Sequence, residues 1–91
     1  MKMSLTELRR FEAALNTFES DVTNDCNRML QGISNCRSYM QKDENSKKAL
    51  DRGEQLVTEI KACLNPTQLL LEKIREMIKH YEAEDDLSFG R

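Results

Sequence analysis

The stretch QKDENSKK at residues 41–48 contains no apolar side chain, and it divides this chain of 91 residues into two arms of similar length. In both arms, apolar residues recur at steps of three and four, which is the period of one face of an α-helix. Across the polar stretch these residues pair in mirror order, so that the two residue numbers of each pair add up to 89. Such an order requires two helices that run in opposite directions. The sequence therefore predicts an all-α fold, an antiparallel two-helix hairpin of the coiled-coil kind.

The predicted seam between the two helices takes apolar residues from both arms. Its members are Leu8, Phe11, Leu15 and Phe18 from the first arm and Leu71, Ile74, Ile78 and Tyr81 from the second. In mirror order, Phe11 faces Ile78 and Phe18 faces Leu71. A stripe at helical spacing is typical of a buried face, so we interpret these residues as core.

A chain of this length is expected to form a single domain, residues 1–91. Its expected parts are helix one at about 4–41, a turn at about 42–46, helix two at about 47–84 and a C-terminal tail at 85–91. Ser4 and Glu7 have the S-x-x-E spacing of a capping box, which supports the first boundary.

Pro66 interrupts the second arm, and it allows two interpretations. Asn65 and Pro66 could begin a fresh helix, as cap and first-turn residue. However, the apolar spacing keeps its phase from Leu64 to Leu71, which favours one helix with a kink at Pro66.

Charge and hydropathy exclude several classes of function. Fourteen basic and sixteen acidic residues are interspersed along the chain, so no basic stripe indicates nucleic-acid binding. No apolar run approaches the roughly 18 residues needed to cross a bilayer, so we expect no membrane insertion. The N-terminus lacks the apolar segment of a secretory signal peptide. We therefore expect a cytoplasmic protein, and any export must use a route that needs no such signal.

Neither catalysis nor metal binding finds support in the residue pattern. His80 is the one histidine, and no nucleophile–base set accompanies it. Cys26, Cys36 and Cys63 lack the paired spacing of a zinc site. We expect no cofactor, no metal and no enzymatic activity. The cysteines are expected to be free, core-packed thiols, with a Cys26–Cys63 disulfide as the alternative because the mirror order places these two opposite each other.

Helix two carries a second apolar row beside the seam, at intervals of seven. Its large members are Leu56, Cys63, Leu70 and Met77. Helix one has no equally full second row, so one partner helix cannot cover the whole apolar surface of helix two. We predict that this row binds another protein, in a four-helix bundle or a larger helical assembly.

The last turn of helix two holds a short motif. Tyr81 and Asp85 fit the pattern Y-x-x-x-[DE], which places an aromatic ring and a carboxylate one turn apart on a helix. With this motif, its central turn and its length, the chain resembles the WXG-type small helical hairpins that the type VII (ESX) system of Gram-positive bacteria and mycobacteria exports. The chain contains no Trp, and polar residues 42–45 replace the W-x-G turn. It is thus more similar to the WXG-like accessory hairpins that bind LXG-type toxins.

The resemblance implies a non-enzymatic targeting factor or chaperone for a type VII secretion substrate. The implied partner is the helical N-terminal domain of an LXG-type toxin, another WXG-like hairpin, or both. Tyr81 and Asp85 would form the export signal, read by the secretion ATPase or another component of the machine. Two alternatives stay open: an intracellular coiled-coil scaffold or adaptor, and a small hairpin subunit or chaperone of another secretion system.

Overall fold

The computed structural model describes the backbone of residues 3–40 and 43–89, and the side chains of residues 3–40 and 43–84. Within these residues the chain forms three α-helices and no strand. Helix α1 spans Leu5–Tyr39, α2 spans Glu44–Ala62 and α3 spans Leu64–Phe89. The all-α prediction is confirmed.

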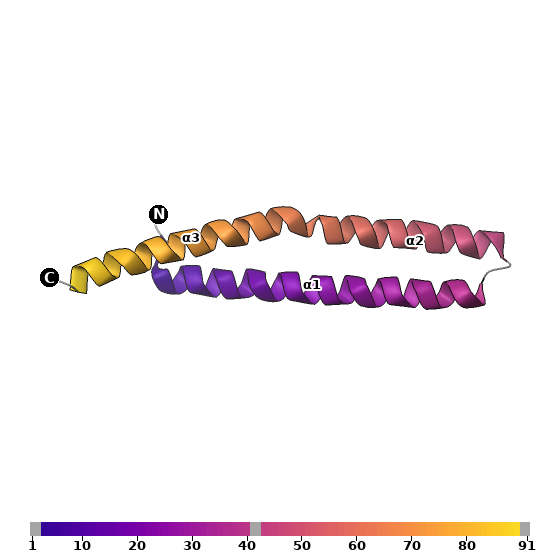
Figure 1. Cartoon of the computed structure of the whole chain (residues 1–91), viewed down its shortest axis with the longest axis horizontal. Helices are drawn as coiled ribbons and strands as arrows, with labels where there is room; N and C mark the ends of the chain where they lie inside the picture. The colour runs from indigo at the N-terminus through magenta and orange to yellow at the C-terminus, as the bar shows by residue number, and fades with distance from the viewer. Residues whose placement is uncertain (1–2, 41–42, 90–91) are drawn as a thin grey trace. The chain divides into compact units, whose positions relative to one another are not determined.

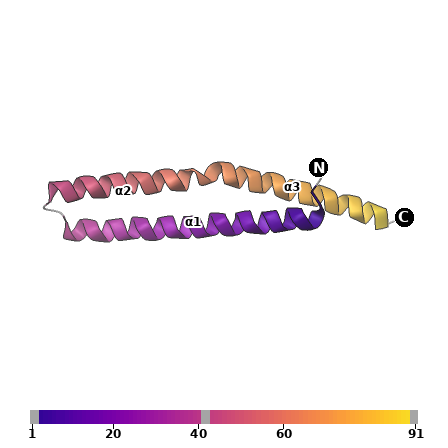
Figure 2. The same cartoon turned by 180° about the vertical axis from the view of Figure 1, so that it is seen from behind.

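The chain divides into two compact units, each an antiparallel pair of helices. The terminal unit contains Met1–Glu19 and Asn65–Arg91, and the central unit contains Ser20–Leu64. In the terminal unit, the N-terminal part of α1 lies beside α3, and in the central unit the C-terminal part of α1 lies beside α2 (Figures 1 and 2). The hairpin prediction is thus confirmed within each unit.

The core of the terminal unit is small. Leu8 (1% exposed), Ile74 (3%) and Ile78 (8%) form a buried cluster, and Leu5, Leu15 and Tyr81 pack against it. Leu71 is also buried. At the start of α1, the N–H of Glu7 donates to Oγ of Ser4 at 3.1 Å, as the S-x-x-E spacing predicts. The predicted seam is therefore present, although not with all of its predicted members.

The prediction is wrong for two seam residues. Phe11 is 38% exposed and Phe18 is 51% exposed, whereas Glu12 and Glu19, one residue further along, are half-buried. An ion pair between Glu12 and Arg75 on α3 holds this side of α1 toward the seam. Phe11 and Glu12 both lie three or four residues from Leu8 and Leu15, so either can share a helix face with these two leucines. The apolar spacing alone therefore did not distinguish Phe11 from Glu12.

The central unit begins its second helix at a capped turn. Asp43 is the N-cap of α2, and its carboxylate accepts hydrogen bonds from Oγ of Ser46 at 2.7 Å and from the N–H of Asn45 at 3.0 Å. These bonds lower the pKa of Asp43, and the bond from the Ser46 side chain contributes most. The cap satisfies backbone N–H groups that the first turn of a helix leaves without partners.

Polar contacts and a few buried side chains join α1 to α2. Arg37 forms ion pairs with Asp51, at 2.7 Å, and with Glu54, and Nζ of Lys61 donates to Oδ1 of Asn27 at 2.9 Å. Hydrogen bonds to the two carboxylates raise the pKa of Arg37. The buried side chains of this unit are Cys26, Val57 and Leu64.

The second arm consists of two helices, which corrects the prediction of one kinked helix. Helix α2 ends at Ala62 and α3 begins at Leu64, with Cys63 between them. Cys63 keeps right-handed helical angles, φ −65 and ψ −12, and its N–H still bonds to the carbonyls of Glu59 and Ile60. The interruption follows from Pro66, which has no N–H to donate to the carbonyl of Ala62, four residues earlier.

The C-terminal boundary also differs from the prediction. Helix α3 continues to Phe89, so residues 85–89 are helical, where a tail was expected from residue 85. Glu and Ala, which favour helix, follow Tyr81, and a helix can extend on local hydrogen bonds without a packing partner.

Candidate partner-binding face

Cross-helix ion pairs define one lateral face of the terminal unit. Nη2 of Arg9 lies 2.9 Å from Oε1 of Glu82, and Nε of Arg75 lies 3.2 Å from Oε2 of Glu12. Nη2 of Arg75 also donates to Oδ1 of Asn16 at 3.5 Å. Each contact joins α1 to α3 beside the buried seam. These five residues form the paired-charge face of the unit.

The opposite face of the terminal unit is apolar. With about 3.6 residues per turn, Phe11 and Phe18 lie on the side of α1 away from its paired charges, and Leu70 and Met77 lie on the corresponding side of α3. Since the helices are antiparallel and share one seam, both rows lie on the same side of the unit. We call these four residues the terminal apolar face.

All four residues of the terminal apolar face are substantially exposed. Phe11 is 38% exposed, Phe18 51%, Leu70 44% and Met77 44%. Within each helix, the two residues are seven apart, which is the spacing of successive contacts along a packed helix. The face therefore has the period of a helix-packing surface, but no helix of the described chain covers it.

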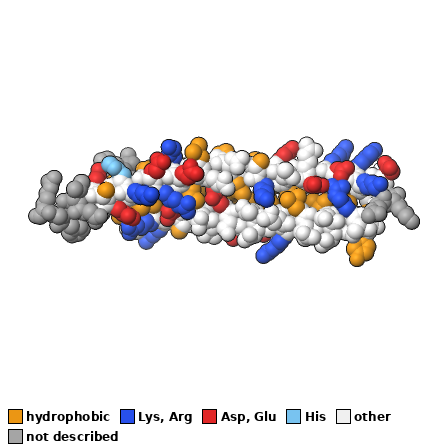
Figure 3. All heavy atoms as spheres, viewed as in Figure 1, with side chains coloured by type: hydrophobic (Ala, Val, Ile, Leu, Met, Phe, Trp, Pro, Cys, Tyr) orange, Lys and Arg blue, Asp and Glu red, His pale blue; other side chains and the backbone are white. Residues whose placement is uncertain are grey.

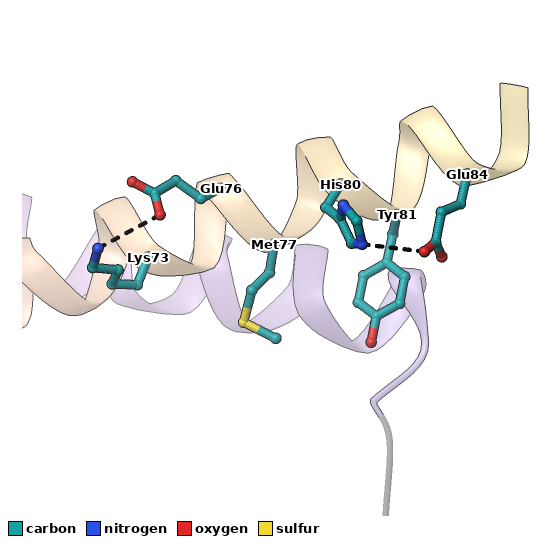
Figure 4. Close-up of a pocket in the computed structure, with 6 residues that line it drawn as sticks. All are labelled: Lys73, Glu76, Met77, His80, Tyr81 and Glu84. Atoms are coloured by element: carbon teal, nitrogen blue, oxygen red, sulfur yellow. Dashed lines mark ion pairs between the residues drawn. The ribbon is translucent and has the colours of Figure 1, made fainter. Parts of the chain in front are cut away.

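A shallow groove of about 470 Å³ adjoins this face on α3 (Figure 4). Its lining residues are Lys73, Glu76, Met77, His80, Tyr81 and Glu84. Nζ of Lys73 lies 3.6 Å from Oε2 of Glu76, and Nε2 of His80 lies 3.1 Å from Oε1 of Glu84. Lys73 is about one turn before Met77, and His80 is about one turn after it. The side chains of Met77 and Tyr81 point to the same side of α3 (Figure 4). The apolar side chains of Met77 and Tyr81 thus adjoin the Lys73–Glu76 ion pair and the His80–Glu84 contact.

The central unit also exposes large apolar side chains. Met29 on α1 is 45% exposed, and on α2 Leu56 is 57% and Ile60 is 40% exposed. By helical geometry, these residues lie on the side of their helices away from Asn27, Lys61 and the partners of Arg37. The central unit therefore repeats the division into a polar and an apolar side.

The predicted partner row is exposed along its whole length, and it divides between the units. Leu56 and Cys63 belong to the central unit, and Leu70 and Met77 to the terminal unit. Helix α1 also exposes three large apolar residues, Phe11, Phe18 and Met29. The signal that could have identified them is the acidic residue after each phenylalanine, Glu12 and Glu19.

The two residues of the predicted export motif are placed differently. Tyr81 is half-buried, packs against the cluster of Leu8, Ile74 and Ile78, and has its ring centroid 6.4 Å from that of His80. The backbone of Asp85 lies in α3, and its side chain lies outside the described residues. Tyr81 thus contributes to the core while part of its ring faces the groove.

The cysteines are free, and they differ in exposure. Cys26 is buried, Cys36 is half-buried and Cys63 is exposed. Cys63 therefore does not pack in the seam opposite Cys26 as the mirror order predicted. In the part of the chain with described side chains, no group of three or more His, Cys, Asp or Glu residues could hold a metal ion.

Charged side chains of both signs are interspersed on the side of the chain seen in Figure 3, with hydrophobic side chains between them. Among the described helices, none combines the length and apolar character required to cross a bilayer. The chain matches no protein-family model, and no curated protein or solved structure shows significant similarity to it.

Proposed function

We propose that this chain is a non-enzymatic binding subunit that docks a helical partner protein on its apolar side. One observation carries the proposal: in the terminal unit, the charged side chains pair across one face, while Phe11, Phe18, Leu70 and Met77 remain uncovered on the other. Exposed apolar residues that occur singly need no explanation, but two parallel rows at heptad spacing indicate an interaction site.

The angular position of the rows favours a partner with two helices. With about 3.6 residues per turn, each row lies roughly a quarter of a turn around its helix from the seam. A helix whose two contact directions differ by a quarter turn fits the square arrangement of a four-helix bundle. A single helix in the groove between α1 and α3 would instead require rows closer to the seam. We therefore propose that the partner contributes an antiparallel helix pair.

The exposed apolar rows supply a driving force for association. Phe11, Phe18, Leu70 and Met77 are between 38% and 51% exposed. At about 25 cal/mol per Å², burial of their exposed apolar area favours docking of a partner.

We further propose that the partner is a type VII secretion substrate, the helical N-terminal domain of an LXG-type toxin, alone or with another WXG-like hairpin. This role rests on the resemblance of the central turn, the length and the Tyr81–Asp85 motif to the accessory hairpins of that system. In this proposal the protein acts as a targeting factor and chaperone. Helix α3 presents the motif to the secretion ATPase or another machine component, and the protein is cytoplasmic before export.

The test of the targeting role separates export from binding. Asp85→Ala is the informative change, because Tyr81 also packs in the core and its loss would affect stability. We expect the variant to bind the toxin domain and melt as the wild type does, while secretion of the toxin in cells is lost. Glu76→Ala, an exposed carboxylate on the same helix outside the motif, is the matched control and should leave secretion intact. Normal secretion with Asp85→Ala would reject the targeting role and leave the binding role in place.

A further inference from the structure

Met77 is the one residue of the terminal apolar face that a mild oxidant can convert into a polar group. Its side chain is 44% exposed, and it lines the groove on α3 (Figure 4). Phe11, Phe18 and Leu70 have no comparable chemistry. Conversion of a thioether to a sulfoxide changes a flexible apolar side chain into a polar one.

The neighbours of Met77 suit the oxidised form. Lys73 lies four residues before Met77 and His80 three residues after it, and both line the same groove. Residues at these spacings are adjacent on a helix surface. Nε2 of His80 is paired with Glu84, but the Lys73 ammonium has three N–H donors, and water at this exposed position can also donate to a sulfoxide oxygen. The oxidised side chain therefore finds hydrogen-bond donors at the free surface, which a dry apolar interface would not supply.

We propose that Met77 is a redox modification site, and that its oxidation by a peroxide prevents the partner from docking. The inference rests on the binding function proposed above. The thioether sulfur donates an electron pair to the terminal oxygen of the peroxide, an S–O bond forms and the O–O bond breaks. Methionine is oxidised by two electrons, and hydrogen peroxide is reduced to water. Methionine sulfoxide reductases reverse the change, so the site can be switched back.

Loss of binding follows from the position of the oxidised group. Docking would bury the sulfoxide between apolar side chains, where a polar group without a hydrogen-bond partner is costly. The fold of the hairpin should not change, because the buried cluster of the terminal unit consists of Leu8, Ile74 and Ile78 and does not include Met77. Oxidation is therefore expected to affect assembly and leave helicity intact.

The experiment uses the full chain and the helical N-terminal domain of an LXG-type toxin as the probe. Wild type and Met77→Leu are treated with hydrogen peroxide and then with dithiothreitol, which reverses oxidation of the exposed Cys63 to a sulfenic acid or a disulfide but not oxidation of methionine. Mass spectrometry of the peptide with Met77 measures conversion, circular dichroism measures helicity, and titration calorimetry measures the Kd. Leucine keeps the apolar volume and resists the oxidant, so Met77→Leu is the matched control.

Oxidised wild type is expected to bind about tenfold or more weakly with unchanged helicity, and treatment with sulfoxide reductases should restore its Kd. Oxidised Met77→Leu should bind like the untreated protein. Equal Kd values for reduced and oxidised wild type, or an equal loss in Met77→Leu, would overturn the proposal while the binding function stands. Failure of both untreated proteins to bind the toxin domain would reject the proposed function, and the switch with it.

Discussion

Nε of Arg75 donates to Oε2 of Glu12 at 3.2 Å, which places the half-buried Glu12, and not Phe11, beside α3. Leu8 and Leu15 are seven residues apart, and both Phe11 and Glu12 lie between them at helical spacing. With Glu12 held at the seam, Phe11 turns outward and becomes part of the terminal apolar face. A polar pair inside the hairpin thus leaves aromatic surface free for another protein.

Reversal of this pair tests its contribution to the hairpin. Arg75→Glu places two carboxylates together and should lower the free energy of unfolding by about 0.5–1 kcal/mol, because both side chains are partly exposed. The double variant Glu12→Arg with Arg75→Glu should recover most of the loss. Urea unfolding of the wild type, the single variants Glu12→Arg and Arg75→Glu, and the double variant gives the coupling energy. A coupling energy of zero would mean that packing of the seam alone orients α1.

The corrected seam makes a second prediction, which contrasts a buried and an exposed apolar residue. Ile74 is 3% exposed and Phe18 is 51% exposed. Ile74→Ala should therefore lower the free energy of unfolding by about 2–4 kcal/mol. Phe18→Ala should lower it by only about 1 kcal/mol, since about half of this residue is exposed to water. Equal losses in urea unfolding would restore the original assignment of Phe18 to the seam.

Glu19 gives a third prediction. It is half-buried at a seam position, and its Oε1 is buried without a hydrogen-bond partner in the described part of the chain. Because a buried polar atom without a partner is unfavourable, Glu19→Leu should raise the free energy of unfolding by about 1 kcal/mol. Asp21→Leu, at an exposed position two residues later, is the control and should change it little. Destabilisation by Glu19→Leu, measured by thermal melting, would show that the carboxylate has a role in the fold.

The cap of α2 predicts a pH dependence. Hydrogen bonds lower the pKa of Asp43 in the folded chain, so its carboxylate stabilises the fold above its ordinary pKa of about 3.9. This contribution is lost as the pH falls through the lowered value. Asp43→Asn keeps a good cap without the titrating group. As the pH is lowered below about 4, the melting temperature of the wild type should therefore fall relative to that of Asp43→Asn. A difference that stays constant from pH 7 to pH 2 would contradict this role of the cap.

The long helices and their antiparallel pairing could be predicted from the sequence, because the apolar period repeats over many turns on both sides of one polar stretch. The exact seam of α1 could not be predicted, since Phe11 and Glu12 both fit the period, and the ion pair of Glu12 with Arg75 on α3 joins residues that are distant in the sequence. The break at Cys63 was missed because a one-residue interruption leaves the apolar phase from Leu64 to Leu71 intact. The exposure of Leu56, Leu70 and Met77 could be predicted, because their row lies beside the seam and other residues of the second arm already form the seam.

Docking on the terminal apolar face is tested most directly by charge substitutions at neighbouring positions on the same helix. Leu69 and Leu70 are 57% and 44% exposed, but a step of one residue turns them to different sides of α3. Leu70→Glu should weaken binding of the LXG-type toxin domain by at least about a hundredfold, since it places a charge in the interface. Leu69→Glu should bind like the wild type.

On α1, Phe18→Glu and the exposed neighbour Thr17→Glu form a second pair with the same expectation. Calorimetric Kd values that rise for Leu70→Glu and Phe18→Glu alone, with unchanged helicity, are the predicted result. Equal Kd values within each pair would contradict the assignment of this face as the docking site.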